Sequence, residues 1–302
     1  MIARQAIQEA YSLIRSYIRR TPVIEDGGVY FKLELLQHTG SFKPRGAFHR
    51  MLAHRVPDAG VVAASGGNHG IATAYAAQRL GCHAEIFVPR ISSPVKVERL
   101  RGYAASVHVE GAVYQESLQL SKEWAERTGA LVVHAYDQWE TLAGQGTVGL
   151  EMEEQIDAPC TVLVASGGGG LIGGIAAWFA GRWKVVNVEP AESAAIARAL
   201  EAGRPVTVKP AGIAVDSLGA TQCGELMFPI AQRFVAESVL VEDAEIRAAQ
   251  KDLWNRFRLM AEPGGATAYA ALLSGRYRVA AGERVVVLVC GSNVDPASVV
   301  GL

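Results

Sequence analysis

Cysteine is scarce in this chain, and its placement excludes two common uses. The four residues, Cys82, Cys160, Cys223 and Cys290, are widely separated, and none stands in a Cys-x-x-Cys pair. This spacing excludes a zinc site built from paired cysteines and also a disulfide-dense secreted scaffold.

An excess of charge of either sign is also missing. The 29 lysines and arginines nearly balance the 30 aspartates and glutamates, for a formal net charge of −1. No long-range field therefore attracts nucleic acid or an anionic membrane. No hydrophobic run approaches the roughly 20 residues that span a bilayer, and the first residues lack the apolar stretch of a signal peptide. We expect a soluble, cytoplasmic protein that binds neither nucleic acid nor membrane.

Hydrophobic residues and glycine, by contrast, are plentiful. Half of the 302 residues are hydrophobic and 32 are glycine, which suits one large α/β domain or two modest ones. Expected strands cover residues 29–33, 61–64, 84–88, 106–109, 131–134, 161–165, 184–189 and 284–289. Expected helices cover residues 3–18, 69–80, 94–101, 112–127, 146–156, 243–259 and 266–274, with one more ending near 180 and a long loop over 203–219. Strands that alternate with helices predict parallel sheets covered on both faces. The alternation falls in two blocks, which suggests two α/β domains with a cleft between them.

The first segment that carries chemistry surrounds Lys43. This lysine follows Phe42 in a stretch flanked by glycines, Gly40 and Gly46. It can serve as a nucleophile that bears a cofactor if desolvation or a nearby cation lowers its pKa from about 10.4. A solvated surface lysine is the alternative for this segment taken alone.

The second segment, residues 65–70, reads Ser-Gly-Gly-Asn-His-Gly between a strand and a helix. Backbone N–H groups at a helix start bind anions, and the glycines let a carboxylate come close. The alternative is a tight turn in which Ser65 or Asn68 caps the helix.

The third segment, residues 166–174, reads Ser-Gly-Gly-Gly-Gly-Leu-Ile-Gly-Gly after the strand at 161–165. Each glycine costs conformational entropy, so four in a row are hard to justify by packing. A phosphate cradled by the backbone at a helix N-terminus is the better explanation, with a simple flexible turn as the alternative. The segment is neither a dinucleotide fingerprint in its usual context nor a Walker loop.

The fourth segment begins at Cys290 and follows the last apolar strand. It reads Cys-Gly-Ser-Asn-Val-Asp. It is either a polar turn beside a buried cysteine or a site where the Cys290 sulfur or the Ser292 hydroxyl meets a ligand heteroatom.

In this order, the four segments resemble the fold-type II pyridoxal-phosphate enzymes, and among them the serine/threonine dehydratase and serine racemase branch. The resemblance runs from about residue 3 to the C-terminus. Other matching segments are residues 20–22, 32–34, 143–147, 188–190 and 262–263. The resemblance implies an α/β fold of two doubly wound three-layer domains, similar to the tryptophan synthase β subunit, with pyridoxal phosphate in the cleft between them. Residues 1–49 and 137–302 would form the large domain that binds the cofactor. Residues 50–136 would form a small mobile domain that closes over the substrate.

The resemblance also implies a role for individual residues. Lys43 would be the catalytic residue and form the internal aldimine with the cofactor. Around the cofactor, Phe42 would lie beside the pyridine ring, Asn68 would hydrogen-bond the phenolic oxygen, Gly167, Gly168, Gly169 and Gly170 would bind the phosphate, and Cys290 would face the ring nitrogen. The loop that takes the substrate carboxylate would be formed by Ser65, Gly66, Asn68 and His69.

The reaction that the resemblance implies is β-elimination. L-threonine or L-serine would lose its β-hydroxyl and amino group to give 2-oxobutyrate or pyruvate plus ammonia, with the freed Lys43 amine as the base for the α-proton. A neutral Cys290 thiol would not hold the ring nitrogen protonated as a carboxylate would, which favours rapid elimination. A homodimer is usual in the family.

The chain departs from the family pattern at several positions. Gly66 stands where racemases of this branch have a serine whose hydroxyl carries a proton, so we expect little racemisation. Glu189 matches one metal ligand, but Ala195 replaces the second carboxylate; we therefore expect no divalent metal and interpret Glu189 as a solvated strand-end residue. The loop at 212–217 lacks the usual Ala-Asp-Gly and could alter substrate choice. The chain ends soon after the fourth segment, so we expect no C-terminal regulatory domain.

Other functions stay open. An extra cation aimed at the substrate β-carbon would favour a hydroxyaspartate ammonia-lyase, and Arg45 and His69 are nearby in sequence. A serine racemase-like enzyme is a further alternative, while cysteine synthases differ from this chain at residues 65–70. A non-catalytic ligand-binding protein on the same scaffold would not need Lys43, and a plain dinucleotide binder fits the glycine segments less well.

Overall fold

The computed structural model describes residues 2–92 and 94–301 and contains two β-sheets, each covered by helices. The larger sheet has six strands in the order β1 (Val23–Asp26), β2 (Val29–Lys32), β10 (Val285–Leu288), β7 (Thr161–Ala165), β8 (Lys184–Pro190) and β9 (Val235–Val241). The smaller sheet has four strands in the order β5 (Ser106–Val109), β4 (Ala84–Val88), β3 (Val61–Ala64) and β6 (Leu131–Val132). In the described part of the chain, the pairing of β1 with β2 is antiparallel and the other pairings between strands are parallel.

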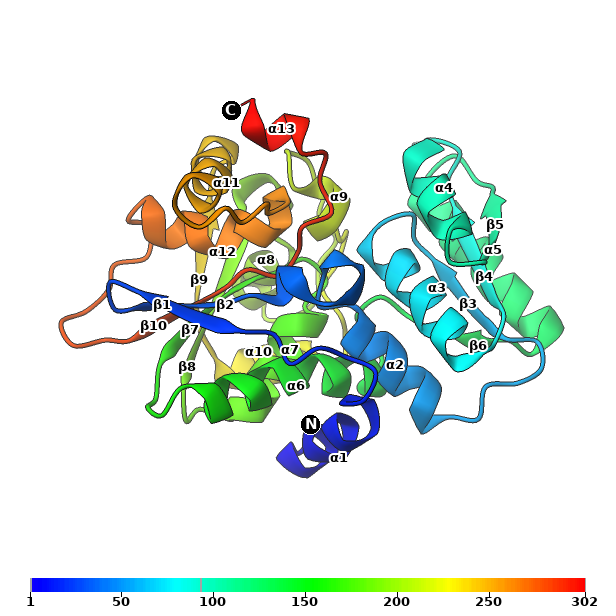
Figure 1. Cartoon of the computed structure of the whole chain (residues 1–302), viewed down its shortest axis with the longest axis horizontal. Coiled ribbons are helices and arrows are strands. Elements are labelled where there is room, and N and C mark those ends of the chain that lie inside the picture. The colour runs from blue at the N-terminus through cyan, green and yellow to red at the C-terminus, as the bar shows by residue number, and fades with distance from the viewer. Residues whose placement is uncertain (1, 93, 302) are drawn as a thin grey trace.

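The helices divide between the two sheets (Figure 1). Those beside the small sheet are α3 (Asn68–Leu80), α4 (Pro94–Arg101) and α5 (Tyr114–Thr128). Those around the large sheet are α1 (Arg4–Ile14), α6 (Trp139–Gln155), α7 (Gly170–Phe179), α8 (Ala195–Ala202), α9 (Val215–Leu218), α10 (Phe228–Phe234), α11 (Asp243–Phe257), α12 (Pro263–Leu273) and α13 (Ala297–Val300). Helix α2 (Pro44–Ala53) lies between the two groups and packs on both α6 and α3.

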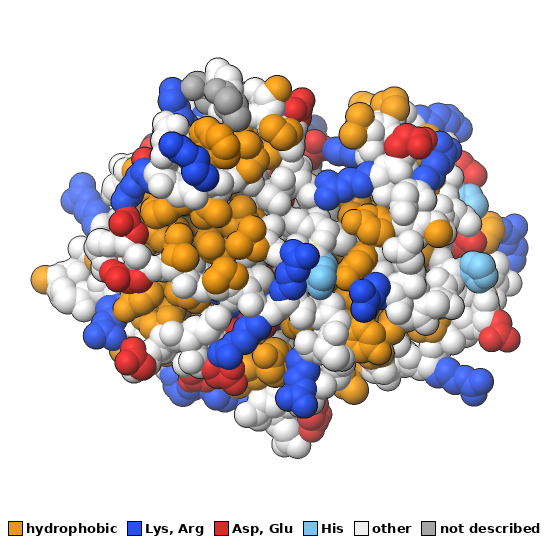
Figure 2. All heavy atoms as spheres, viewed as in Figure 1, with side chains coloured by type: hydrophobic (Ala, Val, Ile, Leu, Met, Phe, Trp, Pro, Cys, Tyr) orange, Lys and Arg blue, Asp and Glu red, His pale blue; other side chains and the backbone are white. Residues whose placement is uncertain are grey.

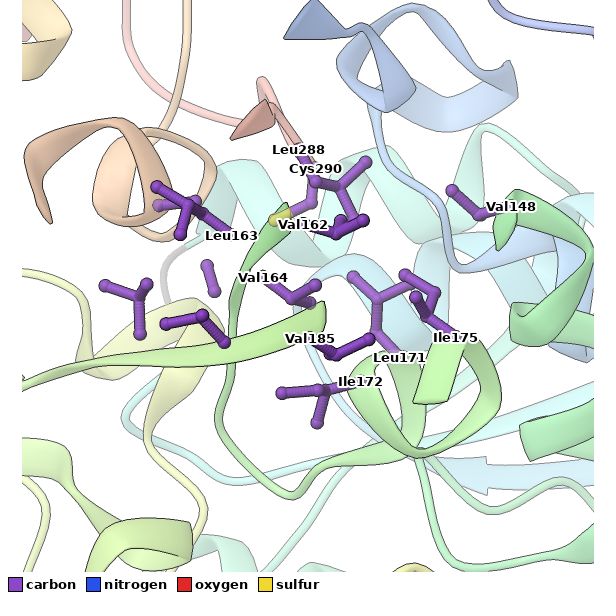
Figure 3. Close-up of a cluster of buried hydrophobic side chains, with 14 of the residues drawn as sticks. Val148, Val162, Leu163, Val164, Leu171, Ile172, Ile175, Val185, Leu288 and Cys290 are labelled. Atoms are coloured by element: carbon purple, nitrogen blue, oxygen red, sulfur yellow. The ribbon is translucent and has the colours of Figure 1, made fainter. Parts of the chain in front are cut away.

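The core of the large domain is built on β7 and β10. Both strands are buried along their whole length, so they read as continuous apolar runs, as expected for parallel strands covered on both faces. Helix α7 is buried on every side. Figure 3 shows its side chains Leu171, Ile172 and Ile175 against those of the strands. The segment between β7 and α7 is therefore held on both sides by rigid elements.

Local signals account for the ends of several helices. Helix α3 is followed by Gly81 and α5 by Gly129, both in the left-handed conformation that glycine adopts without strain. Helix α11 begins with a capping box between Glu242 and Glu245. On the face that Figure 2 shows, acidic and basic side chains are intermingled. Among the described residues, no helix combines the length and apolar character that a membrane span needs.

The predicted fold class of two α/β domains is confirmed. Each of the eight predicted strands has a counterpart, within one to two residues at the ends. Strands β1 and β9 and helices α2, α8, α10 and α13 were not predicted, and the expected loop over 203–219 contains helix α9. The helix predicted over 3–18 ends at Ile14, and the one predicted over 146–156 begins at Trp139. The domain limits at residues 50 and 136 stay a prediction.

Candidate active site

A cleft of about 730 Å³ opens between the two domains. Its walls include Lys43, the turn from Ser65 to His69 that follows β3, and the loop from Ser166 to Gly170 that follows β7. The two turns lie at the carboxyl ends of parallel strands, where open α/β sheets bind ligands. Three of the four segments singled out in the sequence thus line one cavity.

Lys43 immediately precedes helix α2, whose first residue is Pro44. Its Nζ donates a hydrogen bond to the backbone oxygen of Ala135 at 2.7 Å. Burial lowers the pKa of Lys43 to about 8, although Cys290 and Glu262 act in the opposite direction. At neutral pH roughly a tenth of such amines are uncharged and nucleophilic. The solvated surface lysine that we held as the alternative is therefore not what the structure shows.

The first and fourth segments lie side by side although some 250 residues of chain separate them. The backbone N–H of Phe42 donates to Cys290 O at 3.2 Å, and that of Ser292 donates to Gly40 O at 2.8 Å. Ser41 and Gly291 form an antiparallel bridge between these bonds. The extension of β10 thus holds the backbone that leads into Lys43.

Phe42 lies on the cleft wall, and its ring centroid is 5.2 Å from the Lys43 amine. Cys290 is not among the described residues that line the cleft, and Figure 3 shows it among the buried apolar side chains of the large domain. Its Sγ contacts Gly264 O at 3.5 Å. Burial raises the pKa of the Cys290 thiol, so it stays neutral. Its contact with the ring nitrogen stays a prediction, as does the position of Phe42 beside the ring.

The tetraglycine loop is packed more tightly than we expected. A Cβ on Gly168 would lie 2.5 Å from the Tyr136 ring, and one on Gly170 would lie 2.9 Å from Tyr136 Cα. Gly169 has a φ of +90° and faces Met227. Contacts inside the protein therefore require these glycines, contrary to our argument that packing hardly justifies them. The same absence of side chains leaves the loop backbone and the N-terminus of α7 open to the cleft.

Helices α3 and α7 both begin at the cleft. Neither has a side-chain cap: the N-cap residues are Gly67 and Gly169. The first N–H groups of a helix have no partner within it, and with the helix dipole they attract anions. The cleft therefore offers two anion sites, one on each domain.

The turn from Ser65 to His69 is held by its own contacts. Ser65 Oγ accepts a hydrogen bond from the backbone N–H of Gly67 at 3.2 Å, and a Cβ on Gly70 would lie 1.9 Å from Ser65 O. The His69 ring is turned to the domain interior, with Nε2 2.8 Å from Val133 O. A carbonyl can only accept, so Nε2 carries the proton. Burial lowers the pKa of His69 to about 3, so the ring is neutral.

Neither of the two candidate cations for a hydroxyaspartate substrate presents a positive charge to the cleft. Arg45 is fully buried away from the cleft, where Glu34 and Glu151 each bind its guanidinium with two hydrogen bonds. Neither Arg45 nor neutral His69 can supply the positive charge that a hydroxyaspartate carboxylate would need. A cation that the sequence did not reveal, Lys96 of α4, lines the cleft and pairs with Asp216 of α9 at 3.0 Å.

Glu189 is not the solvated residue that we expected. It is fully buried at the end of β8, and its two oxygens accept hydrogen bonds from the backbone N–H groups of Ile196 and Ala197 at 2.8 Å each. It therefore caps the N-terminus of helix α8, where Ala195 is the first helical residue. Burial raises the pKa of Glu189 to about 7. This carboxylate serves the fold.

Known proteins resemble this chain over nearly its whole length. The sequence profile of the family described as "Pyridoxal-phosphate dependent enzyme" matches residues 14–291. A phenylserine dehydratase of Ralstonia pickettii is 37% identical over 97% of this chain and 94% of its own. A catabolic L-threonine dehydratase of Staphylococcus aureus is 36% identical over 98% of this chain and 90% of its own. The structure of maize serine racemase superposes with a TM-score of 0.93 at 32% identity, covering 99% of this chain and 96% of that one.

Proposed function

Because the chain belongs to the family of pyridoxal-phosphate-dependent enzymes, we propose that it is an ammonia-lyase that converts L-threonine or L-serine to 2-oxobutyrate or pyruvate plus ammonia. The observation that carries the proposal is the shared cleft: Lys43, with its lowered pKa, faces the same cavity as two uncapped helix N-termini.

The residues of the cleft fit the cofactor. Pyridoxal phosphate carries an aldehyde, which an amine can bind, and a phosphate, which backbone N–H groups can bind. Lys43 supplies the amine, and the loop from Gly167 to Gly170 with the start of α7 supplies the N–H groups. When bound, the cofactor provides an electron sink for the carbanion at the substrate Cα.

The residues of the chain provide the other parts of the reaction. The Lys43 amine takes the α-proton, for which a pKa near 8 is well suited at neutral pH. The turn from Ser65 to His69 binds the substrate carboxylate at the N-terminus of α3. The proposal keeps the predicted contact between Cys290 and the ring nitrogen; a neutral thiol there would place no negative charge beside the ring, which favours departure of the β-hydroxyl.

Closure of the cleft excludes water from these steps. We assign residues 50–136, which hold the four-stranded sheet, to the domain that moves. The ion pair between Lys96 and Asp216 joins helix α4 to helix α9 beside the cleft and supports this assignment. The proposal also includes a cytoplasmic homodimer; light scattering that gives twice the 32.1 kDa chain mass would support the dimer.

A second candidate substrate is a serine with an aryl group on its β-carbon. One relative is named for phenylserine, and Ile91, Tyr114 and Tyr136 place apolar surface on the cleft wall. The wall could accept a ring in place of the threonine methyl group.

The test is release of 2-oxo acid by the purified holoenzyme from L-serine, L-threonine, D-serine, 3-hydroxyaspartate and phenylserine. The proposal expects L-threonine or L-serine to react fastest and Lys43→Ala to release none. Fastest release from phenylserine would favour the second candidate. Release from 3-hydroxyaspartate alone, or formation of D-serine without 2-oxo acid, would contradict the proposal. No reaction with any substrate would favour a non-catalytic binding protein.

A further inference from the structure

The carboxamide of Asn68 is held at both ends by residues from distant parts of the chain. Its Oδ1 accepts a hydrogen bond from Asn293 Nδ2, and its Nδ2 donates to Glu262 Oε1 at 2.6 Å. Asn68 begins helix α3, Glu262 precedes helix α12, and Asn293 follows β10. These contacts therefore link the domain of the small sheet to that of the large sheet.

The amide of Asn293 determines which way round the Asn68 carboxamide lies. Asn293 Nδ2 also donates to the backbone oxygen of Thr39 at 2.9 Å. A carbonyl oxygen can only accept, so the NH₂ group of Asn293 must face both Thr39 and Asn68. The atom of Asn68 beside it must then be the oxygen. A flipped carboxamide would set two NH₂ groups against each other.

Glu262 is placed for this contact and not for capping its own helix. It stands at the N-cap of α12, yet its side chain makes no cap hydrogen bond, and it is 6% exposed. Its backbone N–H donates to Gly291 O at 3.1 Å, and a Cβ on Gly291 would lie 1.9 Å from Glu262 Oε1. Glycine at 291 thus leaves the room that the carboxylate occupies beside Asn68.

One N–H of Asn68 remains after these contacts. The carboxamide has two amide hydrogens, and one of them is donated in the hydrogen bond to Glu262. The other has no acceptor in the described part of the chain, and Asn68 lies on the cleft wall. We infer that Glu262 and Asn293 are positioning residues, which orient Asn68 so that its second N–H donates to an oxygen of the group bound in the cleft. This inference rests on the proposed function, in which that group is the cofactor.

The protonation state of Glu262 does not alter the orientation. Burial raises its pKa to about 7, opposed by the hydrogen bond from Asn68. Asp216 of α9 raises the pKa further, while Arg99 and Lys96 of α4 lower it. A neutral carboxyl group still keeps an oxygen that accepts the Asn68 N–H. The glutamate is therefore needed as an acceptor, and glutamine can replace it.

The test compares Glu262→Ala, Glu262→Gln and Asn293→Ala with a matched control, Glu189→Gln. The control also neutralises a buried carboxylate whose pKa is raised to about 7, but one that contacts helix α8 instead of the cleft. Two quantities are measured on the full chain: the dissociation constant of pyridoxal phosphate, and the hydrogen-exchange rate of the Asn68 carboxamide by NMR without added cofactor. The Asn68→Ala variant identifies the NMR signal of the carboxamide. Its dissociation constant shows how far cofactor binding weakens when the Asn68 contact is lost completely.

We expect Glu262→Ala and Asn293→Ala to weaken cofactor binding by roughly three- to tenfold, the effect of one hydrogen bond, and to speed exchange of the Asn68 N–H groups. Glu262→Gln and the control should stay within about twofold of the wild type. Should Glu262→Ala fail to fold, Asn293→Ala and Glu262→Gln still decide the matter.

Two results would overturn the inference alone. In the first, Glu262→Ala and Asn293→Ala keep the wild-type cofactor affinity and exchange rate while Asn68→Ala binds the cofactor more weakly. In the second, Glu262→Gln loses as much cofactor affinity as Glu262→Ala. A wild-type protein that binds no pyridoxal phosphate would overturn the proposed function and the inference together.

Discussion

Replacing Glu151 with glutamine should destabilise the protein strongly, because it unbalances a fully buried set of charges. Lys32, Glu34, Arg45 and Glu151 have side chains with no exposed surface. Glu151 accepts hydrogen bonds from Arg45 at 2.8 and 2.9 Å and from Lys32 at 2.6 Å. Lys32 Nζ has three acceptors, Glu151, Thr21 O and Gln155, one for each of its three protons. The set therefore holds two positive and two negative charges.

The size of the effect follows from the charge left behind. Glu151→Gln leaves one uncompensated positive charge in the interior. The glutamine also has one oxygen where the carboxylate has two, so its NH₂ group faces Arg45 or Lys32. Breaking a buried pair in this way costs about 3–5 kcal/mol. The free energy of unfolding of a native protein is typically about 5–15 kcal/mol, so the substitution would remove a large part of it. At roughly 2–4 °C per kcal/mol, the melting temperature should fall by about 6–20 °C.

Urea unfolding followed by circular dichroism measures this effect. Glu153→Gln is the matched control on the same helix, because its ion pairs with Arg4 and Arg182 are part-exposed and should contribute less than about 1 kcal/mol each. Adding Lys32→Met to Glu151→Gln restores neutrality, so the double variant should be more stable than the sum of the single effects predicts. A loss in Glu151→Gln no larger than that in Glu153→Gln would refute the reasoning.

Three further predictions concern proton-binding groups and the cleft. The rate at which pyridoxal phosphate attaches covalently to the cofactor-free protein, followed by absorbance, should rise about tenfold per pH unit up to a pH of about 8 and then level, because the lowered pKa of Lys43 sets the neutral fraction of the amine; a rate independent of pH would contradict this. L-serine in deuterated water should give pyruvate with little D-serine, because Gly66 offers no hydroxyl to the substrate; D-serine formed as fast as pyruvate would contradict the role of Gly66. Burial raises the pKa of Glu189 to about 7, so the folded protein holds a proton that the unfolded chain releases near pH 4. The unfolding free energy should therefore fall as the pH rises from about 4 to 7. Glu189→Gln should remove its share of that fall in urea titrations, and an unchanged pH dependence in the variant would speak against the assignment.

Short-range sequence signals were enough to predict the parts of the fold that have them. Buried strands such as β7 and β10 are unbroken apolar runs, and the glycine turns that follow β3 and β7 mark where the cleft lies. Strand β9 was missed because it lies at the sheet edge, where exposed Ala236 and Glu237 interrupt the apolar pattern. Helix α2 was missed because Pro44 and Gly46 read as part of a loop.

The contacts that support the site could not be predicted in the same way, because they join residues far apart in the chain. Glu262 and Asn68 are 194 positions apart, and Arg45 and Glu151 are 106 apart. A glutamate before a proline reads as an ordinary helix start, and an arginine after a proline as a surface residue. Gly291, a glycine after a buried strand, was a local signal of a close approach. The match of residues 262–263 to the family pattern marked Glu262 without giving its partner. The direction in which His69 points was equally hidden, since its partner Val133 lies on another segment.

The most direct test of the account is reduction of the holoenzyme with borohydride, followed by peptide mass mapping. Because Lys43 is proposed as the residue that binds pyridoxal phosphate covalently, the reduced cofactor should appear on the peptide that contains Lys43 and be absent from the Lys43→Arg variant. Label on another lysine, or none on a folded protein supplied with the cofactor, would contradict the account.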